Sequence, residues 1–266
     1  MENADMLHLN RRNAVSLTDN TKGQNERQNK IIHSIAMELR TPVTVMKSNI
    51  QLLKKFCRGI EQSFVEESFS LCEDSVDNIL RFIDCVKFLS DADQGKFEVK
   101  KIRFNVGSFI SQMMEELNHS NFDVTRIHVQ IAVSTNHIIT DKYLLNRIMI
   151  NLLGNALKFS PSIIELFVSQ TNHQLTVLVR DYGIGIPAEE IAEIFNPFVR
   201  ASNVKMISGT GLGLSIVSKS VTCLEGAVSV SSMEGKGAEF KVVIPLEPDL
   251  KRSMQGKKSN QLIPQL

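Results

Sequence analysis

The strongest constraint on the fold is a regular apolar repeat in the first third of the chain. Its members step alternately by four and three residues: Val65, Phe69, Cys72, Val76, Ile79, Ile83 and Val86. This heptad spacing puts one apolar stripe along a helix, and such a stripe is typical of helices that pack in a bundle or coiled coil. We therefore expect this part of the chain to belong to a helical bundle.

A looser apolar stripe precedes this repeat, formed by Ile32, Ile35, Leu39, Met46, Ile50 and Leu53. Residues 54–63 separate the two stripes and contain a glycine, so the chain can turn there. Residues 29–95 are thus predicted to form a helical hairpin. Because two helices bury little apolar surface alone, we expect two copies to pair into a dimeric four-helix bundle.

The pattern changes near residue 100, where apolar and polar residues begin to alternate as in half-buried strands. We expect an α/β sandwich domain with largely antiparallel strands over residues 100–247, which makes the chain α+β overall. Polar residues 1–28 and 248–266 are expected to form a lead-in and a tail. The expected strands lie at 96–106, 127–133, 163–170, 174–181 and within 227–246, and the expected helices at 108–117, 141–159 and 214–221.

Composition narrows the class of protein. The 266 residues are 42% apolar and 22% charged with a net charge of +1, as in an ordinary soluble globular protein without reason to bind nucleic acid. No apolar run reaches the roughly 20 residues that cross a bilayer, so we expect a cytoplasmic protein without membrane insertion. The cysteines lack metal or disulfide spacing, and we expect reduced thiols at Cys57, Cys72, Cys85 and Cys223.

The first motif with chemical meaning lies on the predicted helix 141–159. Asn151 and Asn155 are four residues apart and share a helix face, and Lys158 follows one turn later. Carboxamide oxygens can bind a hard cation, and an ammonium group can offset phosphate charge. The alternative interpretation is a plain polar helix surface.

A second motif follows the predicted strand 174–181. Asp181 lies where that strand ends, and Gly183 and Gly185 let the backbone approach a ligand closely. The carboxylate can accept a hydrogen bond from an exocyclic amine, which suggests adenine. The alternative is a simple glycine–proline turn.

Two further features lie downstream. Gly209, Gly211 and Gly213 precede the predicted helix 214–221, and the N–H groups at a helix N-terminus can bind phosphate. Residues 188–208 lie between the glycine clusters, as a mobile lid would, and Arg200 within them can reach a phosphate. The alternatives are ordinary turns and a surface arginine.

Taken in order, these motifs resemble the ATP-binding domain shared by two-component histidine kinases, gyrase-type ATPases, Hsp90 and MutL. Gyrase-type ATPases have a glutamate one turn before the Asn155–Ala156 pair, whereas Asn151 stands there, as in histidine kinases. Without that carboxylate as a general base, the site should hydrolyse ATP poorly and instead present its γ-phosphate to another group.

The resemblance implies ATP and Mg²⁺ as cofactors. It implies that Asn151 and Asn155 hold the metal and that Asp181 reads adenine. The nucleotide-binding residues that it implies are Asn151, Asn155, Lys158, Phe159, Asp181, Gly183, Gly185, Arg200, Gly209, Thr210, Gly211, Leu212 and Gly213.

Residues 33–53 resemble the dimerisation and phosphoacceptor helix of histidine kinases, whose motif begins His-Glu-x-x-Thr-Pro. By this resemblance Glu38 is the base beside the acceptor, Thr41 orients water during dephosphorylation of a response regulator, and Pro42 bends the helix. The acceptor position itself is occupied by Met37, and a thioether cannot accept a phosphoryl group.

Helical geometry predicts where Met37 points. At about 100° per residue, Met37 lies roughly 160° from Ile35 and Leu39, so we expect it on the exposed side of the helix. His33 is one turn earlier and is an alternative acceptor, although Ser34 rather than a carboxylate follows it.

The leading hypothesis is therefore a histidine-kinase-family signalling protein, of the ATP-dependent phosphotransfer class, that binds ATP and Mg²⁺ but is impaired in conventional autophosphorylation. One alternative is a response-regulator phosphatase that uses Glu38 and Thr41. Another is a non-catalytic scaffold or heterodimer partner of an intact kinase. The expected partners are a second copy of the chain, a receiver domain and another histidine kinase. Asn151 disfavours a gyrase-like ATPase.

Overall fold

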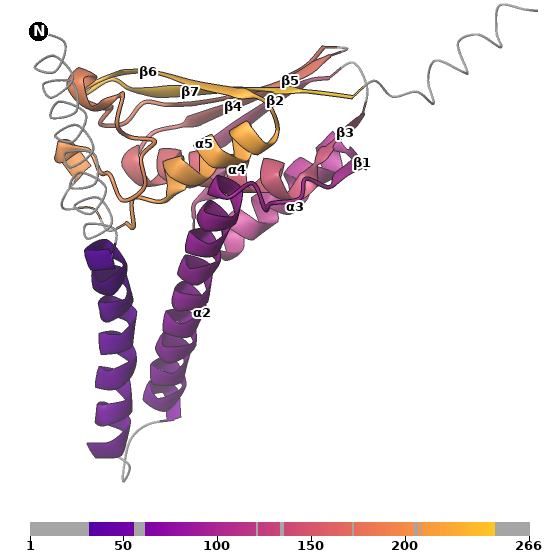
Figure 1. The fold of residues 1–266 in the computed structure, drawn as a ribbon. Helices are drawn as coiled ribbons and strands as arrows, with labels where there is room; N and C mark the ends of the chain where they lie inside the picture. The colour runs from indigo at the N-terminus through magenta and orange to yellow at the C-terminus, as the bar shows by residue number, and fades with distance from the viewer. Residues whose placement is uncertain are drawn as a thin grey trace, which may run out of the picture. The chain divides into compact units, whose positions relative to one another are not determined.

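The computed structural model describes residues 32–55, 62–120, 122–133, 136–171, 173–204, 207 and 209–247 (Figure 1). The predicted lead-in and tail lie outside the described residues. The chain divides into two compact units, Met1–Asp84 and Cys85–Leu266, and the division falls within one long helix. Among the described residues, no helix combines the length and the apolar character needed to cross a membrane.

The first unit is a helical hairpin, as the sequence predicts. Helix α1 spans residues 32–55, and the unit also contains helix α2 (Gln62–Asp93) as far as Asp84. The two helices lie side by side, with the Cys72 Sγ 3.9 Å from the backbone oxygen of Met46. The assignment of α1 is helical throughout, Pro42 included, and the bend expected there stays a prediction. The connecting residues 56–61 lie outside the described part of the chain.

The predicted apolar stripe of α2 divides between two faces. Val65, Cys72 and Ile79 are half-buried, whereas Phe69, Val76 and Ile83 are 56%, 45% and 49% exposed in the single chain. Buried positions nearby include Ser68 and Ser75, and the Ser75 hydroxyl is satisfied by donating to the backbone oxygen of Leu71 at 2.7 Å. The members of the exposed set recur every seven residues, so they line one side of the helix.

The second unit is an α/β sandwich, which confirms the predicted α+β class. Its main sheet has the order β2-β4-β5-β7-β6; only the β2–β4 pair is parallel, and β1 and β3 form a separate antiparallel pair. Helices α4 and α5 lie along one face of the main sheet (Figure 1). The elements are β1 (Lys101–Asn105), α3 (Val106–His119), β2 (Ile127–Ala132), β3 (His137–Asp141), α4 (Lys142–Phe159), β4 (Ile164–Gln170), β5 (Gln174–Asp181), α5 (Gly213–Cys223), β6 (Ala227–Met233) and β7 (Gly237–Pro245).

The sequence interpretation differs from the structure at the smaller sheet. Strand β3 was not predicted, and residues 96–100 of the predicted strand 96–106 are not in a strand. Strand β3 has only five residues and runs directly into α4, so it contains too few alternations to recognise. Asp141 ends β3 and caps α4, because its Oδ1 accepts from the Leu144 N–H at 3.0 Å.

Helix α4 is the central element of the core. Its buried face packs beneath the sheet, and each large apolar side chain buried in this way stabilises the fold by about 1.5–3 kcal/mol. Arg126 closes the other end of the helix, donating to the backbone oxygens of Ser160 at 2.6 Å and Leu157 at 3.0 Å. With both ends fixed, the polar face of α4 is held in one orientation. The buried residues of α4 are Leu144, Leu145, Ile148, Met149, Leu152, Leu153, Ala156 and Leu157.

Candidate nucleotide-binding site

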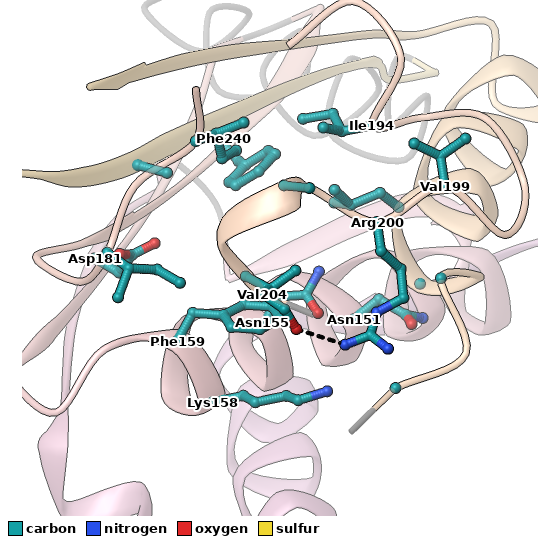
Figure 2. A pocket seen from close by; sticks show the side chains of 18 of the residues that line it. Asn151, Asn155, Lys158, Phe159, Asp181, Ile194, Val199, Arg200, Val204 and Phe240 are labelled. Atoms are coloured by element: carbon teal, nitrogen blue, oxygen red, sulfur yellow. Dashed lines mark hydrogen bonds between the residues drawn. The ribbon is translucent and has the colours of Figure 1, made fainter. Parts of the chain in front are cut away.

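The four motifs predicted from the sequence meet around one cavity of about 350 Å³ in the second unit (Figure 2). Its walls come from the polar face of α4, the loop after β5, the segment leading into α5, and β7. Motifs that are far apart in the sequence therefore share one site. The predicted residues that line it are Asn151, Asn155, Lys158, Phe159, Asp181, Gly185, Arg200, Gly209, Thr210, Gly211 and Gly213.

The two asparagines on α4 present carboxamide groups to the start of α5. The Asn151 Nδ2 donates to the backbone oxygen of Arg147 at 2.7 Å, and only the amide NH₂ can face a carbonyl, so Oδ1 is directed elsewhere. A Cβ added at Gly213 would lie 3.0 Å from this Oδ1 and 3.8 Å from the Asn155 Nδ2. The carboxamide oxygen of Asn151 therefore lies against the N-terminus of α5.

These donors fit a hard divalent cation better than a transition metal. Oxygen ligands suit Mg²⁺, which keeps several waters and uses few protein ligands alongside substrate phosphates. Within the described residues, no group of three or more His, Cys, Asp or Glu side chains is placed to hold a metal. The polar face of α4 offers the carboxamide oxygens of Asn151 and Asn155 to the cavity.

Asp181 supplies a buried carboxylate at the opposite side of the cavity from Arg200 and Asn151 (Figure 2). The alternation of β5 buries Leu175, Val177, Val179 and then Asp181, which is 8% exposed. Its Oδ1 accepts from the Gly183 N–H at 2.9 Å. Burial raises the pKa of the Asp181 carboxyl, against the opposite effect of the N–H groups of Gly183 and Ala238. The carboxylate can accept a further hydrogen bond from a ligand.

Lys158 brings positive charge to the glycine-rich segment. A Cβ added at Gly209 would lie 2.5 Å from the Lys158 Nζ, so the ammonium group passes directly beside that backbone. The following helix α5 has eleven residues, and its first N–H groups have no partner within the helix. An anion placed here would meet both the ammonium group and the positive end of the helix dipole.

Arg200 lies in the segment that covers the cavity, which we define as residues 188–204. Its guanidinium donates to the backbone oxygen of Val204 at 2.7 Å (Figure 2). It also donates to the backbone oxygen of Ile207. Arg200 therefore braces the covering segment as well as lining the cavity. The phosphate contact that the sequence suggests for it stays a prediction.

Two predicted residues do not line the cavity. A Cβ at Gly183 would lie 2.2 Å from the backbone oxygen of Phe159, so Gly183 permits the loop after β5 to pass the end of α4. Leu212 is only 2% exposed and packs in the core. Both residues support the site from outside its surface.

The sequence reasoning missed most of the apolar lining. Strand alternation marks Ala238 and Phe240 as inward-facing, but it does not show that this end of β7 faces a cavity rather than the core. The remaining residues lie in loops or at a helix start, where no periodic signal exists. The missed lining residues are Ile184, Ile186, Ile194, Val199, Ala201, Val204, Leu214, Ala238 and Phe240.

On helix α1 of the first unit, the predicted exposure of Met37 is confirmed. Met37 is 50% exposed, and Thr41 and His33 are also exposed. Ile35 and Leu39 are half-buried on the other side, as the helical arithmetic requires. Glu38 is half-buried beside Met37.

The fold and the cavity together define an ATP-binding domain of a recognisable class. Residues 140–248 match the family described as histidine kinase-, DNA gyrase B-, and HSP90-like ATPase. The autoinducer 2 sensor kinase/phosphatase LuxQ of Vibrio parahaemolyticus is 32% identical over 224 residues, which cover 79% of this chain and 25% of LuxQ. The chain spans about a quarter of the length of the LuxQ proteins of several Vibrio species that it matches.

Two solved structures extend the similarity across both units. Full-length ShkA, in complex with AMPPNP, shares 27% identity with a TM-score of 0.59 and covers 80% of this chain and 44% of that one. The Acinetobacter baumannii histidine kinase AdeS has a TM-score of 0.60 over 79% of this chain and 98% of that one, and at 19% identity it shows the same fold. The chain therefore belongs to the sensor histidine kinase family and carries its helical hairpin and ATP-binding domain.

Proposed function

We propose that this chain is a two-component signalling core that binds ATP with Mg²⁺ and is impaired in conventional autophosphorylation. The observation that supports the proposal has two parts. The nucleotide motifs line one cavity. On α1, which resembles the phosphoacceptor helix, the exposed residue at the acceptor position is Met37. A thioether is neutral, and its sulfur cannot give a stable phosphoryl adduct as an imidazole nitrogen can. The chain thus has the residues of a nucleotide site but lacks a histidine at the acceptor position.

In the proposed nucleotide complex, each end of the cavity has its own task. Asp181 accepts a hydrogen bond from the exocyclic amine of adenine, and apolar side chains such as Phe240 and Ile194 enclose the base. Asn151 and Asn155 hold Mg²⁺, which offsets the charge of the phosphates when it is bound. Lys158 and the N-terminus of α5 bind the phosphates.

The residue at position 151 also determines what happens to bound ATP. An asparagine cannot take a proton from water, so the site lacks a general base where a gyrase-type enzyme has one. ATP is therefore retained with little hydrolysis, and its γ-phosphate is available to an acceptor group outside the cavity.

Incubation of the purified chain with γ-labelled ATP and Mg²⁺ tests the proposal. We expect nucleotide binding without the acid-labile, base-stable label that phosphohistidine gives. Such a label on the wild-type chain would overturn the proposed impairment. If a label appears, its loss in His33→Ala would identify His33 as the labelled residue. His33 is the alternative acceptor because it is exposed one turn before Met37.

A second candidate function is removal of phosphate from a response regulator. It is favoured by the retention of Glu38 and Thr41, by the exposure of Thr41, and by the kinase/phosphatase name of the LuxQ relatives. We expect a phosphorylated receiver domain to lose phosphate faster with the wild type than with Thr41→Ala. Thr44→Ala is the matched control, since the Thr44 hydroxyl donates to the Arg40 carbonyl of its own helix. Equal rates for the wild type and Thr41→Ala would eliminate this function.

We further propose that α2 pairs with a second copy of the chain. Phe69, Val76 and Ile83 leave a large apolar stripe exposed in the single chain, and burial of such side chains is favourable. Light scattering should give a dimer for the wild type and a monomer for Ile83→Glu. Asn78→Glu adds the same charge on another side of α2 and should leave the dimer intact. A monomeric wild type would favour the heterodimer or scaffold alternatives.

A further inference from the structure

Two separate segments enclose the apolar end of the cavity. The loop after β5 contributes Ile184 and Ile186, and the covering segment contributes Ile194 and Val204. A side-chain hydrogen bond joins the two segments, because the Asn203 Nδ2 donates to the backbone oxygen of Gly185 at 3.0 Å. Asn203 is therefore placed to control how these two walls separate.

The loop after β5 is a firm anchor for this hydrogen bond. The backbone oxygen of Ile184 accepts from the Gly235 N–H at 2.7 Å, and the Ile186 N–H donates to the Ser232 Oγ at 2.9 Å. Gly185 has a φ of +66°, and a Cβ there would lie 2.1 Å from the Met233 backbone oxygen. The Gly185 carbonyl is thus fixed against the β6–β7 hairpin.

The covering segment is held by several contacts, among them the edge-on packing of the Phe195 ring against Phe240 of β7, with ring centroids 6.5 Å apart. The Ser202 N–H donates to the Glu190 Oε2 at 2.9 Å, which links two parts of the segment itself. The Phe198 N–H donates to the Gly211 backbone oxygen at 3.0 Å, which holds the segment near α5. The Asn203 bond adds a direct hydrogen bond from this segment to the anchored loop.

The oxygen of the Asn203 amide lies in a different environment from its nitrogen. Its Oδ1 is buried and has no hydrogen-bond partner among the described residues. A buried amide oxygen without a partner destabilises a fold, and an apolar side chain would avoid that cost. The hydrogen bond that this amide makes is the one from its Nδ2 to the Gly185 carbonyl.

We propose that Asn203 is a positioning residue that latches the covering segment to Gly185 and so sets the rate at which nucleotide leaves the cavity. This inference rests on the proposed function, because it takes the bound molecule to be ATP. A base held between the two walls contacts both of them, and separation of the walls breaks the Asn203 bond together with those contacts. Loss of one such bond should speed dissociation about fivefold.

The test measures dissociation of a fluorescent ATP analogue from the full chain with Mg²⁺, after mixing with excess unlabelled ATP. Asn203→Asp keeps the side-chain shape but removes the NH₂ group, and it turns an oxygen toward the Gly185 carbonyl. We expect about fivefold or greater acceleration for Asn203→Asp and for Asn203→Ala. Ser202→Ala is the matched control, because the Ser202 contact to Glu190 uses its backbone N–H, and its rate should equal that of the wild type.

The variants and controls distinguish failure of the latch proposal from failure of the proposed ATP binding. Leu175→Val removes part of a buried side chain at the end of β5 away from Asp181, and Leu175 does not line the cavity, so it should lower thermal stability without accelerating dissociation. Dissociation from both Asn203 variants within twofold of the wild-type rate would overturn the latch alone. Acceleration by Leu175→Val equal to that of the Asn203 variants would also overturn it. A wild-type chain that binds no ATP analogue would overturn the proposed function and the latch with it.

Discussion

Replacing Gly213 with alanine should separate the stability of the fold from its ability to bind Mg²⁺ and ATP. Gly213 is the first residue of α5, and its φ is not in the left-handed region, so alanine meets no backbone strain there. Alanine in a helix is generally favoured over glycine by about 0.5–1 kcal/mol, with less expected in the first turn. The folded state should therefore be unchanged or slightly more stable.

The effect on the cavity has the opposite sign. The new Cβ would lie 3.0 Å from the Asn151 Oδ1, so that oxygen must move by a few tenths of an ångström. Magnesium tolerates little change, since it requires near-octahedral ligands at about 2.0–2.1 Å. We expect ATP affinity with Mg²⁺ to fall about tenfold, or about 1.4 kcal/mol, with a smaller loss in the presence of a chelator.

Calorimetric titration with ATP, with and without Mg²⁺, and thermal unfolding measure the two effects. Gly154→Ala is the matched control, because it lies inside α4 and its Cβ would make only ordinary contact with the Phe122 ring at 3.8 Å. The control should gain stability and bind ATP normally. If Gly213→Ala binds ATP and Mg²⁺ as tightly as the wild type, Asn151 does not hold the metal through this oxygen.

Further predictions concern Asp181 and Arg126. Asp181→Asn should weaken ATP binding about tenfold or more, because a hydrogen bond to a charged group is worth about 1.5–3 kcal/mol. Burial raises the pKa of the Asp181 carboxyl, so the folded protein holds this proton more tightly than the unfolded chain does. Protonated Asp181 therefore stabilises the fold. This stabilisation is fully present below the unfolded pKa of about 3.9 and is lost as the pH rises through the folded pKa. Asp181→Asn should be more stable than the wild type at neutral pH, a difference that disappears in acid; a constant difference across pH would contradict this reasoning. Arg126→Ala removes donors to the Ser160 and Leu157 carbonyls and should cost about 1–3 kcal/mol in chemical denaturation; an unchanged midpoint would show that this cap adds no stability.

Periodic segments explain why much of the fold could be predicted from the sequence. Helix α4 has a buried apolar face and a polar face at helical spacing, and β5 alternates strictly until Asp181. Local patterns of this kind fix which face is buried before any tertiary contact is known. Strand β3 was missed because five residues give too short a pattern.

The division of the α2 stripe could not be predicted, because heptad spacing alone does not say which members face the chain's own hairpin. Phe69 and Val76 continue the repeat but are exposed, whereas the buried side chains of α2 include Ser68, Ser75, Phe82, Phe88 and Leu89. The buried positions follow from which neighbouring elements pack against each part of the helix, and the repeat itself does not encode this. The heptad residues that remain exposed support the proposed pairing with a second copy.

Only part of the candidate site could be predicted from the sequence. The polar and glycine residues could be predicted because the order of the motifs resembles a known ATP-binding domain, although each motif alone also fits an ordinary turn or a polar surface. The contacts of Arg200 with Val204 and of Asn203 with Gly185 depend on how loops fold back, which no local period encodes. Such contacts become visible only when the chain is folded.

Labelling of Met37→His with γ-labelled ATP is the measurement that tests the central claim most directly. The account predicts no phosphohistidine on the wild type or on Met37→Gln, and acid-labile label on Met37→His that disappears when Asn155→Ala is added. That result would mean that the chain has a working ATP site and lacks the acceptor residue. Equal label on the wild type and Met37→His, or none on Met37→His despite normal ATP binding, would contradict it.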